Sequence, residues 1–201
     1  MTSKDFQLVD AHCHLDFPDF AEEREAVIAR ALEAGVTRMV TICTKLKNAS
    51  AVRAISEAHD PVFWAAGTHP MSAADEPLAS VEDLVELARH PKMVGIGETG
   101  LDYHYTAESK PVQQESLRIH IEAARRTGLP LIIHARDADD DMARILAEEH
   151  AAAIAEEGAE TELRESFIRR KISIDGYSTD RAYPPNAEVL AEFEEWKKTH
   201  S

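Results

Sequence analysis

Two histidines placed two positions apart, His12 and His14, directly follow the apolar run QLVDA. On a strand, residues i and i+2 point to the same side, so these two imidazoles could bind one metal ion together. Neutral imidazole is a common ligand of zinc and similar divalent ions. Cys13 lies between them and would point the other way, toward packing. The pair alone also fits two polar histidines of a loop, so it does not establish a metal site.

Glu98 and His134 end two further apolar runs, MVGIGE and LPLIIH. A carboxylate at the end of a buried strand is costly unless a metal ion or hydrogen bonds compensate its lost hydration. Each residue alone has a simpler interpretation: Glu98 could be a buried carboxylate that accepts hydrogen bonds from backbone amides, and His134 could be a hydrogen-bonded histidine of the core. With His12 and His14 they form a set of imidazole and carboxylate donors that suits two Mg²⁺, Mn²⁺ or Zn²⁺ ions, one carboxylate bridging both.

Candidates for contacting a substrate lie beside this set. His69, in the string GTHP, could bind a phosphate or leaving group, although shaping the loop before Pro70 explains it equally well. Arg136 could hold a phosphate in a bidentate fork, with pairing to Asp137 or Asp102 as the alternative. The remaining histidines that fall on or beside predicted helices are expected at the surface: His59, His90, His120, His150 and His200.

The elements that must position these residues alternate between short apolar runs and amphipathic segments. Strands are predicted to begin near residues 7, 38, 61, 92 and 129. Helices are predicted over 21–34, 48–58, 80–90, 111–127 and 138–149, and 171–180 is predicted as another strand. This alternation favours an α/β domain with a parallel sheet, in which all carboxyl ends of the strands meet at one edge.

Composition narrows the class of protein further. The chain has 201 residues, 22 basic and 37 acidic, for a net charge of −15. An acidic chain repels nucleic acid at long range, so chemistry on phosphates would need metal cations. The chain has two cysteines and no signal-like start, so we expect a cytoplasmic protein with reduced thiols. It has no apolar run of about 18 residues, so we expect no membrane partner. A monomer is the default expectation.

Four strings, VDAHCHLDF, GTHP, GETGLDYHY and PLIIHARDA, resemble the TatD family of metal-dependent deoxyribonucleases over about residues 7–149. The resemblance implies a TIM-barrel-like (β/α)8 fold of the amidohydrolase-like group and a two-metal site. It implies hydrolysis of phosphodiester bonds in DNA, often from the 3′ end. It also implies that His12 and His14 hold the first ion, that Glu98 bridges, and that His134 holds the second.

The sequence departs from that family after residue 149. The metal histidine of the family's sixth strand and the essential aspartate of its eighth have no matching string here. Asp175 is a catalytic candidate beside Glu98 and could replace that aspartate, although an ordinary turn aspartate before Gly176 is the simpler interpretation; His150 is a poorer substitute. At about 30 residues per strand–helix unit, the remaining length holds fewer than the three units that a closed barrel needs.

We therefore expect one domain over 1–201, in which 1–149 is TatD-like and 150–201 is divergent or truncated, with an incomplete barrel. The leading hypothesis is a hydrolase of ester bonds, a deoxyribonuclease or exonuclease with DNA as substrate. One alternative is a truncated or inactive relative that binds metal without turnover. Another is a hydrolase of a different ester or amide on the same scaffold, because a fold does not fix its substrate.

Overall fold

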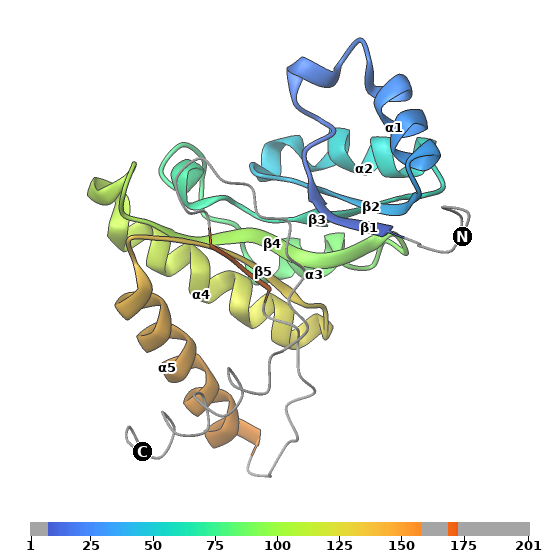
Figure 1. The fold of residues 1–201 in the computed structure, drawn as a ribbon. Coiled ribbons are helices and arrows are strands. Elements are labelled where there is room, and N and C mark those ends of the chain that lie inside the picture. The colour runs from blue at the N-terminus through green and yellow to red at the C-terminus, as the bar shows by residue number, and fades with distance from the viewer. Residues whose placement is uncertain (1–7, 158–168, 173–201) are drawn as a thin grey trace, which may run out of the picture.

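A computed structural model describes residues 8–157 and 169–172 of the chain, and its six described strands form one sheet (Figure 1). The sheet order is β1-β2-β3-β4-β5-β6, and each neighbouring pair is parallel. The strands are β1 (Leu8–Cys13), β2 (Val36–Ile42), β3 (Val62–Ala66), β4 (Met93–Asp102), β5 (Leu131–Arg136) and β6 (Arg169–Ile172). All carboxyl ends therefore lie along one edge of the sheet, as the alternating pattern predicts.

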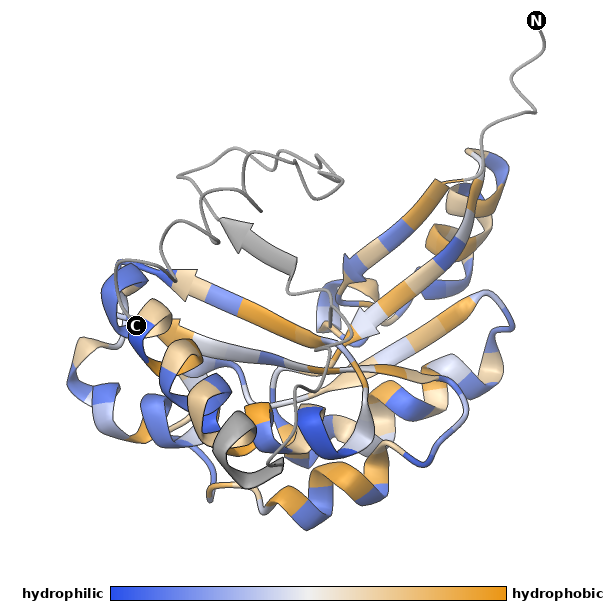
Figure 2. Ribbon diagram, turned by 90° about the horizontal axis from the view of Figure 1, so that it is seen from below, coloured by the Kyte–Doolittle hydropathy of each residue, from blue (hydrophilic) through white to orange (hydrophobic). Residues whose placement is uncertain are grey.

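Helices connect the strands and pack against the sheet: the first two contact β2 and β3, and the last two contact β4 and β5 (Figures 1 and 2). Local signals start and end several of them. Ser80 and Asp83 form a reciprocal capping box at the start of α3, and Gly128, in the left-handed conformation, ends α4. The helices are α1 (Arg24–Glu33), α2 (Ala49–Ala58), α3 (Val81–Leu87), α4 (Lys110–Thr127) and α5 (Asp139–Glu157).

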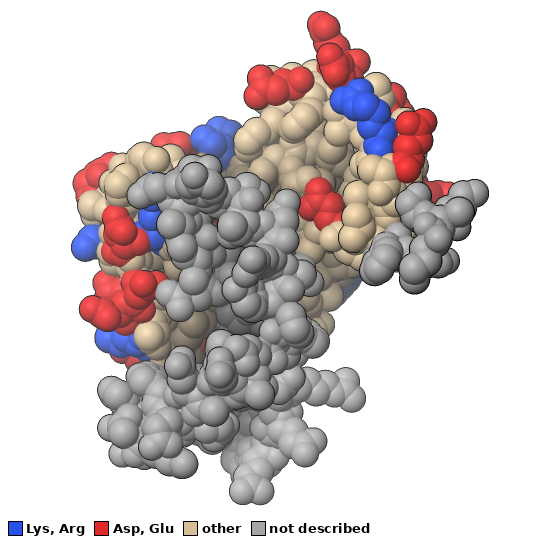
Figure 3. Space-filling view, in the orientation of Figure 1, with Lys and Arg blue, Asp and Glu red and all other residues tan. Residues whose placement is uncertain are grey.

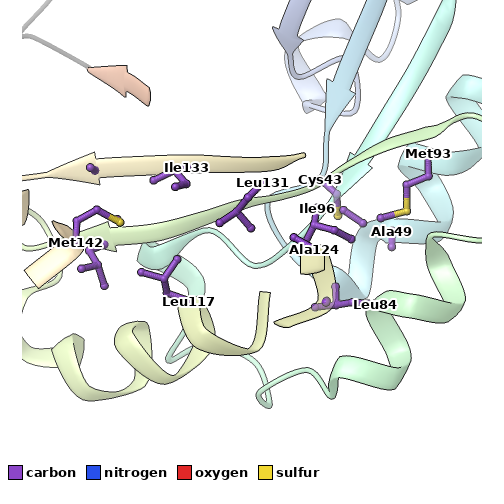
Figure 4. Packing of buried hydrophobic residues seen from close by; sticks show 14 of the residues in the cluster. Cys43, Ala49, Leu84, Met93, Ile96, Leu117, Ala124, Leu131, Ile133 and Met142 are labelled. Carbon is purple, nitrogen blue, oxygen red and sulfur yellow. The ribbon is translucent and has the colours of Figure 1, made fainter. Parts of the chain in front are cut away.

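The larger hydrophobic core fills the space between the sheet and these helices. Figure 4 shows Ile96, Leu131 and Ile133 of the strands facing Leu84 and Leu117 of the helices. Burying such side chains is the main favourable contribution to folding and fixes the sheet against its helical layer. The core therefore gives the strand ends a rigid support.

Gly100 allows β4 to lie close to β5 at the position of His134. Its φ is +141°, and a Cβ at this position would collide with the carbonyl oxygen of His134, its partner across the strand pair. A side chain here is excluded by both conformation and space. The second glycine of the string GETG is thus required by the close approach of the strands that carry Glu98 and His134.

The structure confirms the predicted α/β class and the five predicted strand positions, and it revises some boundaries. The predicted strand 171–180 appears in the described residues as β6, Arg169–Ile172. The helix predicted over 138–149 extends to Glu157. Asn48, the first residue of the helix predicted over 48–58, directly precedes α2, and its side chain makes no capping hydrogen bond. Within the described part of the chain, no helix has both the length and the apolar character needed to span a membrane.

Candidate metal centre

The four histidines and the glutamate singled out in the sequence come together at the carboxyl edge of the sheet. His12 and His14 come from the end of β1 and the residue after it, His69 follows β3, Glu98 lies in β4 and His134 in β5. Ligand atoms of His12, His14 and Glu98 all lie within 4.8 Å of one another, and so do those of His69, Glu98 and His134. The residues predicted at the strand ends therefore lie close together in space.

Glu98 is the centre of this cluster and is only 4% exposed. Its Oε2 lies 3.1 Å from His12 Nε2, and its Oε1 lies 3.5 Å from His134 Nδ1 and 3.9 Å from His69 Nε2. Burial alone would raise the pKa of this carboxyl, but hydrogen bonds with His12 and His134 outweigh it and hold the pKa far below its usual range. Glu98 is therefore an anion whose two oxygens face different histidines.

His14 presents a lone pair to the cluster. Its Nδ1 lies 3.1 Å from the carbonyl oxygen of Ile42, which can only accept, so Nδ1 carries the proton. Burial and the neighbouring His12 lower the pKa of His14, which keeps the ring neutral. Nε2 is then unprotonated, as a metal ligand requires.

His134 is fixed by a residue that the sequence analysis did not assign to it, Asp102. Asp102 is fully buried, and its Oδ2 lies 3.0 Å from His134 Nε2. This carboxylate accepts a hydrogen bond from Nε2–H, and Nδ1 is left facing Glu98. Burial would lower the pKa of His134, but Glu98 and Asp102 together raise it. In the absence of a metal a proton can take the position between His134 and Glu98, and a divalent ion must displace it.

The other oxygen of Asp102 organises the loop after β4. Oδ1 accepts the backbone N–H groups of His104 at 3.1 Å and Tyr105 at 2.8 Å. The buried Gln113 of α4 accepts the backbone N–H of Asp102 at 2.7 Å and donates to its carbonyl oxygen. One carboxylate thus connects the orientation of His134 with the position of Tyr105.

His69 presents a protonated ring nitrogen to the cluster, whereas His14 presents an unprotonated one. Its Nδ1 accepts the backbone N–H of Met71 at 3.2 Å, so in the neutral ring Nε2 carries the proton and points toward Glu98. Burial is the main reason that the pKa of His69 is lowered to about 4, which keeps the ring neutral near pH 7. In this tautomer His69 is a hydrogen-bond donor to the site and not a metal ligand.

The predicted surface position of His120 is wrong. This side chain is fully buried on the inner face of α4, and burial lowers its pKa to about 4. Its Nδ1 donates to the Ser116 carbonyl oxygen at 2.7 Å, and its Nε2 accepts the Thr68 N–H at 3.1 Å. The Thr68 hydroxyl donates to Glu76 at 2.8 Å. His120 therefore anchors the loop that carries His69.

The remaining predicted residues lie around or outside the cluster. The guanidinium of Arg136 lies over the ring of Tyr105, 4.6 Å from its centroid. Cys13 points away from the histidines, and its thiol donates to the Val40 carbonyl oxygen, as expected for a packing residue. His59, His90 and His150 are partly buried and not fully at the surface. Asp175 and His200 lie outside the described residues.

The donor set fits divalent metal ions by its chemistry. His14 and His134 each have one ring nitrogen committed to an oxygen acceptor, the arrangement that fixes a metal-ligating imidazole. Glu98 is shared by both groups of candidate ligands, as a bridging carboxylate would be. Neutral imidazole with carboxylate suits zinc or manganese, and the carboxylate also suits magnesium.

Comparison with known proteins finds relatives that are named as metal-dependent hydrolases. The family model "TatD related DNase" matches residues 9–193. The uncharacterized metal-dependent hydrolase YabD of Bacillus subtilis is 37% identical over 147 residues, which cover 73% of this chain and 58% of that protein. The 3′-5′ ssDNA/RNA exonuclease TatD of Shigella flexneri is 28% identical over 69% of this chain and 54% of its own length.

A solved structure has the same fold. The crystal structure of YjjV, a TatD homologue from Escherichia coli, superposes with a TM-score of 0.65 at 34% identity, covering 71% of this chain and 56% of that one. The chain thus spans slightly more than half the length of the relatives it matches.

Proposed function

This chain belongs to the TatD related DNase family, and on that premise we propose that it is a metal-dependent hydrolase that cleaves phosphodiester bonds of single-stranded DNA. The observation that carries the proposal is Glu98, a buried anion with each oxygen facing a different set of histidines. The Shigella relative is named a 3′-5′ ssDNA/RNA exonuclease, which supports a single-stranded nucleic acid as the substrate class.

Four residues would hold the ions: His12 and His14 on one side, His134 on the other, and Glu98 between them. Divalent ions, when bound there, would supply Lewis-acid polarisation of a phosphoryl oxygen and would activate water for hydrolysis. They also supply the positive charge that a chain of net charge −15 lacks for a phosphate substrate.

The other residues orient and donate. Asp102 holds the Nε2 proton of His134 so that Nδ1 faces the site. His69 directs its Nε2–H toward the same space, where it can donate to a non-bridging or leaving oxygen of the substrate. His120 and Thr68 fix the backbone next to His69. In this proposal His14 and His134 offer nitrogen lone pairs to cations, and His69 offers an N–H to the anionic substrate.

The test is cleavage of a 5′-labelled single-stranded oligonucleotide by the purified, folded chain with Mg²⁺ or Mn²⁺. We expect cleavage that stops when EDTA is added and a metal content of about two ions per chain. A metal-loaded sample that leaves DNA intact would overturn the proposal. If that sample hydrolyses a p-nitrophenyl ester or an amide, the protein is a hydrolase of a different substrate. If it hydrolyses none of these compounds, it is a relative that binds metal without turnover.

Replacing His69 separates its donor role from a ligand role. We expect His69→Ala to lower kcat on single-stranded DNA by about tenfold, because a hydrogen bond to a charged oxygen is lost. Metal content, measured by mass spectrometry of the metal, should equal that of the parent. His59→Ala, which removes another partly buried histidine, is the matched control. A parallel loss of metal would show instead that His69 is a ligand.

A further inference from the structure

Two exposed aromatic rings lie next to the metal-ligand candidates. Phe17 is 39% exposed and Tyr105 is 56% exposed. Phe17 follows β1 and Tyr105 follows β4, so both belong to loops at the carboxyl edge of the sheet. Single exposed aromatic side chains are ordinary on protein surfaces. Here the Phe17 ring contacts His14, and the Tyr105 backbone is linked to His134 through Asp102.

The Phe17 ring is stacked on the imidazole of His14. The ring centroids are 4.7 Å apart and the planes are inclined by only 17°. His12 meets the same imidazole edge-on at 5.1 Å, so His14 lies between His12 and Phe17. The turn is held in place because Leu15 is buried and its N–H donates to Thr41 Oγ1 at 3.1 Å. Phe17 is therefore a pre-positioned ring with one face on a ligand and substantial area open to solvent.

Tyr105 is positioned by the carboxylate that orients His134. Its backbone N–H donates to Asp102 Oδ1, while Asp102 Oδ2 binds His134. The Arg136 guanidinium lies over the Tyr105 ring, and His104 meets the ring edge-on with centroids 4.6 Å apart. An exposed aromatic ring beside a guanidinium is a combination that favours both a base and its phosphate.

The charge of the chain makes such rings more important. With 37 acidic and 22 basic residues, the protein gains little binding energy from releasing counterions along a DNA backbone. Figure 3 shows acidic side chains among the described residues over α1 and near α4 and α5. Attraction for a nucleic acid must then come from contacts at the site, and stacking on an aromatic ring does not depend on net charge.

We propose that Phe17 and Tyr105 are stacking platforms for unpaired bases on either side of the scissile phosphodiester. The proposal rests on the proposed function and deepens it, because it names the residues that select single strands. A duplex keeps its bases paired and stacked internally, so it offers no base face to either ring. Stacking on one aromatic ring contributes enough to change affinity by about tenfold per base.

The test compares two single strands that share a phosphodiester backbone, oligothymidylate and an abasic strand of tetrahydrofuran units. We expect the parent to have a lower KM for oligothymidylate. Phe17→Leu and Tyr105→Leu should each remove about tenfold of that preference, while Phe17→Tyr should restore most of it. If the rings bind different bases, the double variant should lose the product of the two effects. Leu32→Ala, an exposed apolar residue of α1, is the control that keeps the parent's preference.

Two results would overturn the proposal. An equal loss of rate on both strands, with a fall in metal content, would mean that Phe17 only supports His14. An unaltered preference in both Leu variants would mean that neither ring contacts a base. Failure of the proposed function is a different result, because the parent itself would then cleave neither strand.

Discussion

Glu98→Gln is expected to reduce cleavage of single-stranded DNA by at least about 10³-fold. The amide has the shape of the carboxylate but no charge, and its nitrogen cannot ligate a cation. The substitution removes the anion that faces His12 on one side and His134 on the other. Losing the shared ligand of both candidate groups removes the electrostatic stabilisation that metal-assisted phosphoryl chemistry depends on.

Metal content and folding must be measured beside the rate. Glu98→Gln should bind fewer metal ions than the parent and should still unfold in one cooperative transition by circular dichroism. Glu57→Gln provides a matched control, because Glu57 also pairs with a histidine, His90 at 3.2 Å, but lies on the exposed side of α2. That variant should keep the parent's rate. Glu98→Gln with a rate within tenfold of the parent would contradict the assignment.

Asp102→Asn is expected to lower metal affinity and activity by about 100-fold. The side-chain oxygen should remain with the two loop N–H groups that now bind Oδ1, since an amide N–H₂ cannot accept them. The amide nitrogen then faces His134 and donates to Nε2. This donation forces the proton onto Nδ1, the atom that faces Glu98, and so places a hydrogen where the metal ligand should be.

A second aspartate–histidine pair on the same edge of the sheet provides the control. Asp137 Oδ2 lies 2.9 Å from His104 Nδ1, and both side chains are exposed. Asp137 has a φ of +52°, which asparagine tolerates as well as aspartate does. Asp137→Asn should therefore leave metal affinity within about twofold of the parent, as measured by titration against a fluorescent chelator. Equal affinities for Asp102→Asn and the parent would show that Asp102 does not orient His134.

Much of the fold was predictable because its signals are local. Each strand is a short apolar run, and polar residues mark its carboxyl end, so both the parallel sheet and the edge that carries His12, Glu98 and His134 follow from one pattern. The capping box at Ser80 and the left-handed Gly128 are equally local. Proximity of the ligands followed because parallel strands place their carboxyl ends together.

What the sequence could not show are contacts between residues far apart in the chain. The bond between His134 and Asp102 joins positions 32 apart, and the bond between Thr68 and His120 joins positions 52 apart. His120 had a detectable signal, because it shares the helical spacing of Leu117 and Ala124, both buried on α4. Because histidine is polar, its type predicts the surface. His120 can be buried because its Nε2 accepts the Thr68 N–H, a contact that the sequence does not show.

The order of the sheet bears on how the protein is made. Every described strand pairs with the strand that precedes or follows it in the chain, so a ribosome delivers each one beside a neighbour that is already available. Growth can then proceed one strand–helix unit at a time, from the amino terminus onward. The four candidate ligands all emerge by the end of the fifth strand: His12, His14, Glu98 and His134. A metal ion present during synthesis would therefore meet these candidate ligands on the nascent chain and stabilise the first five strands as they form.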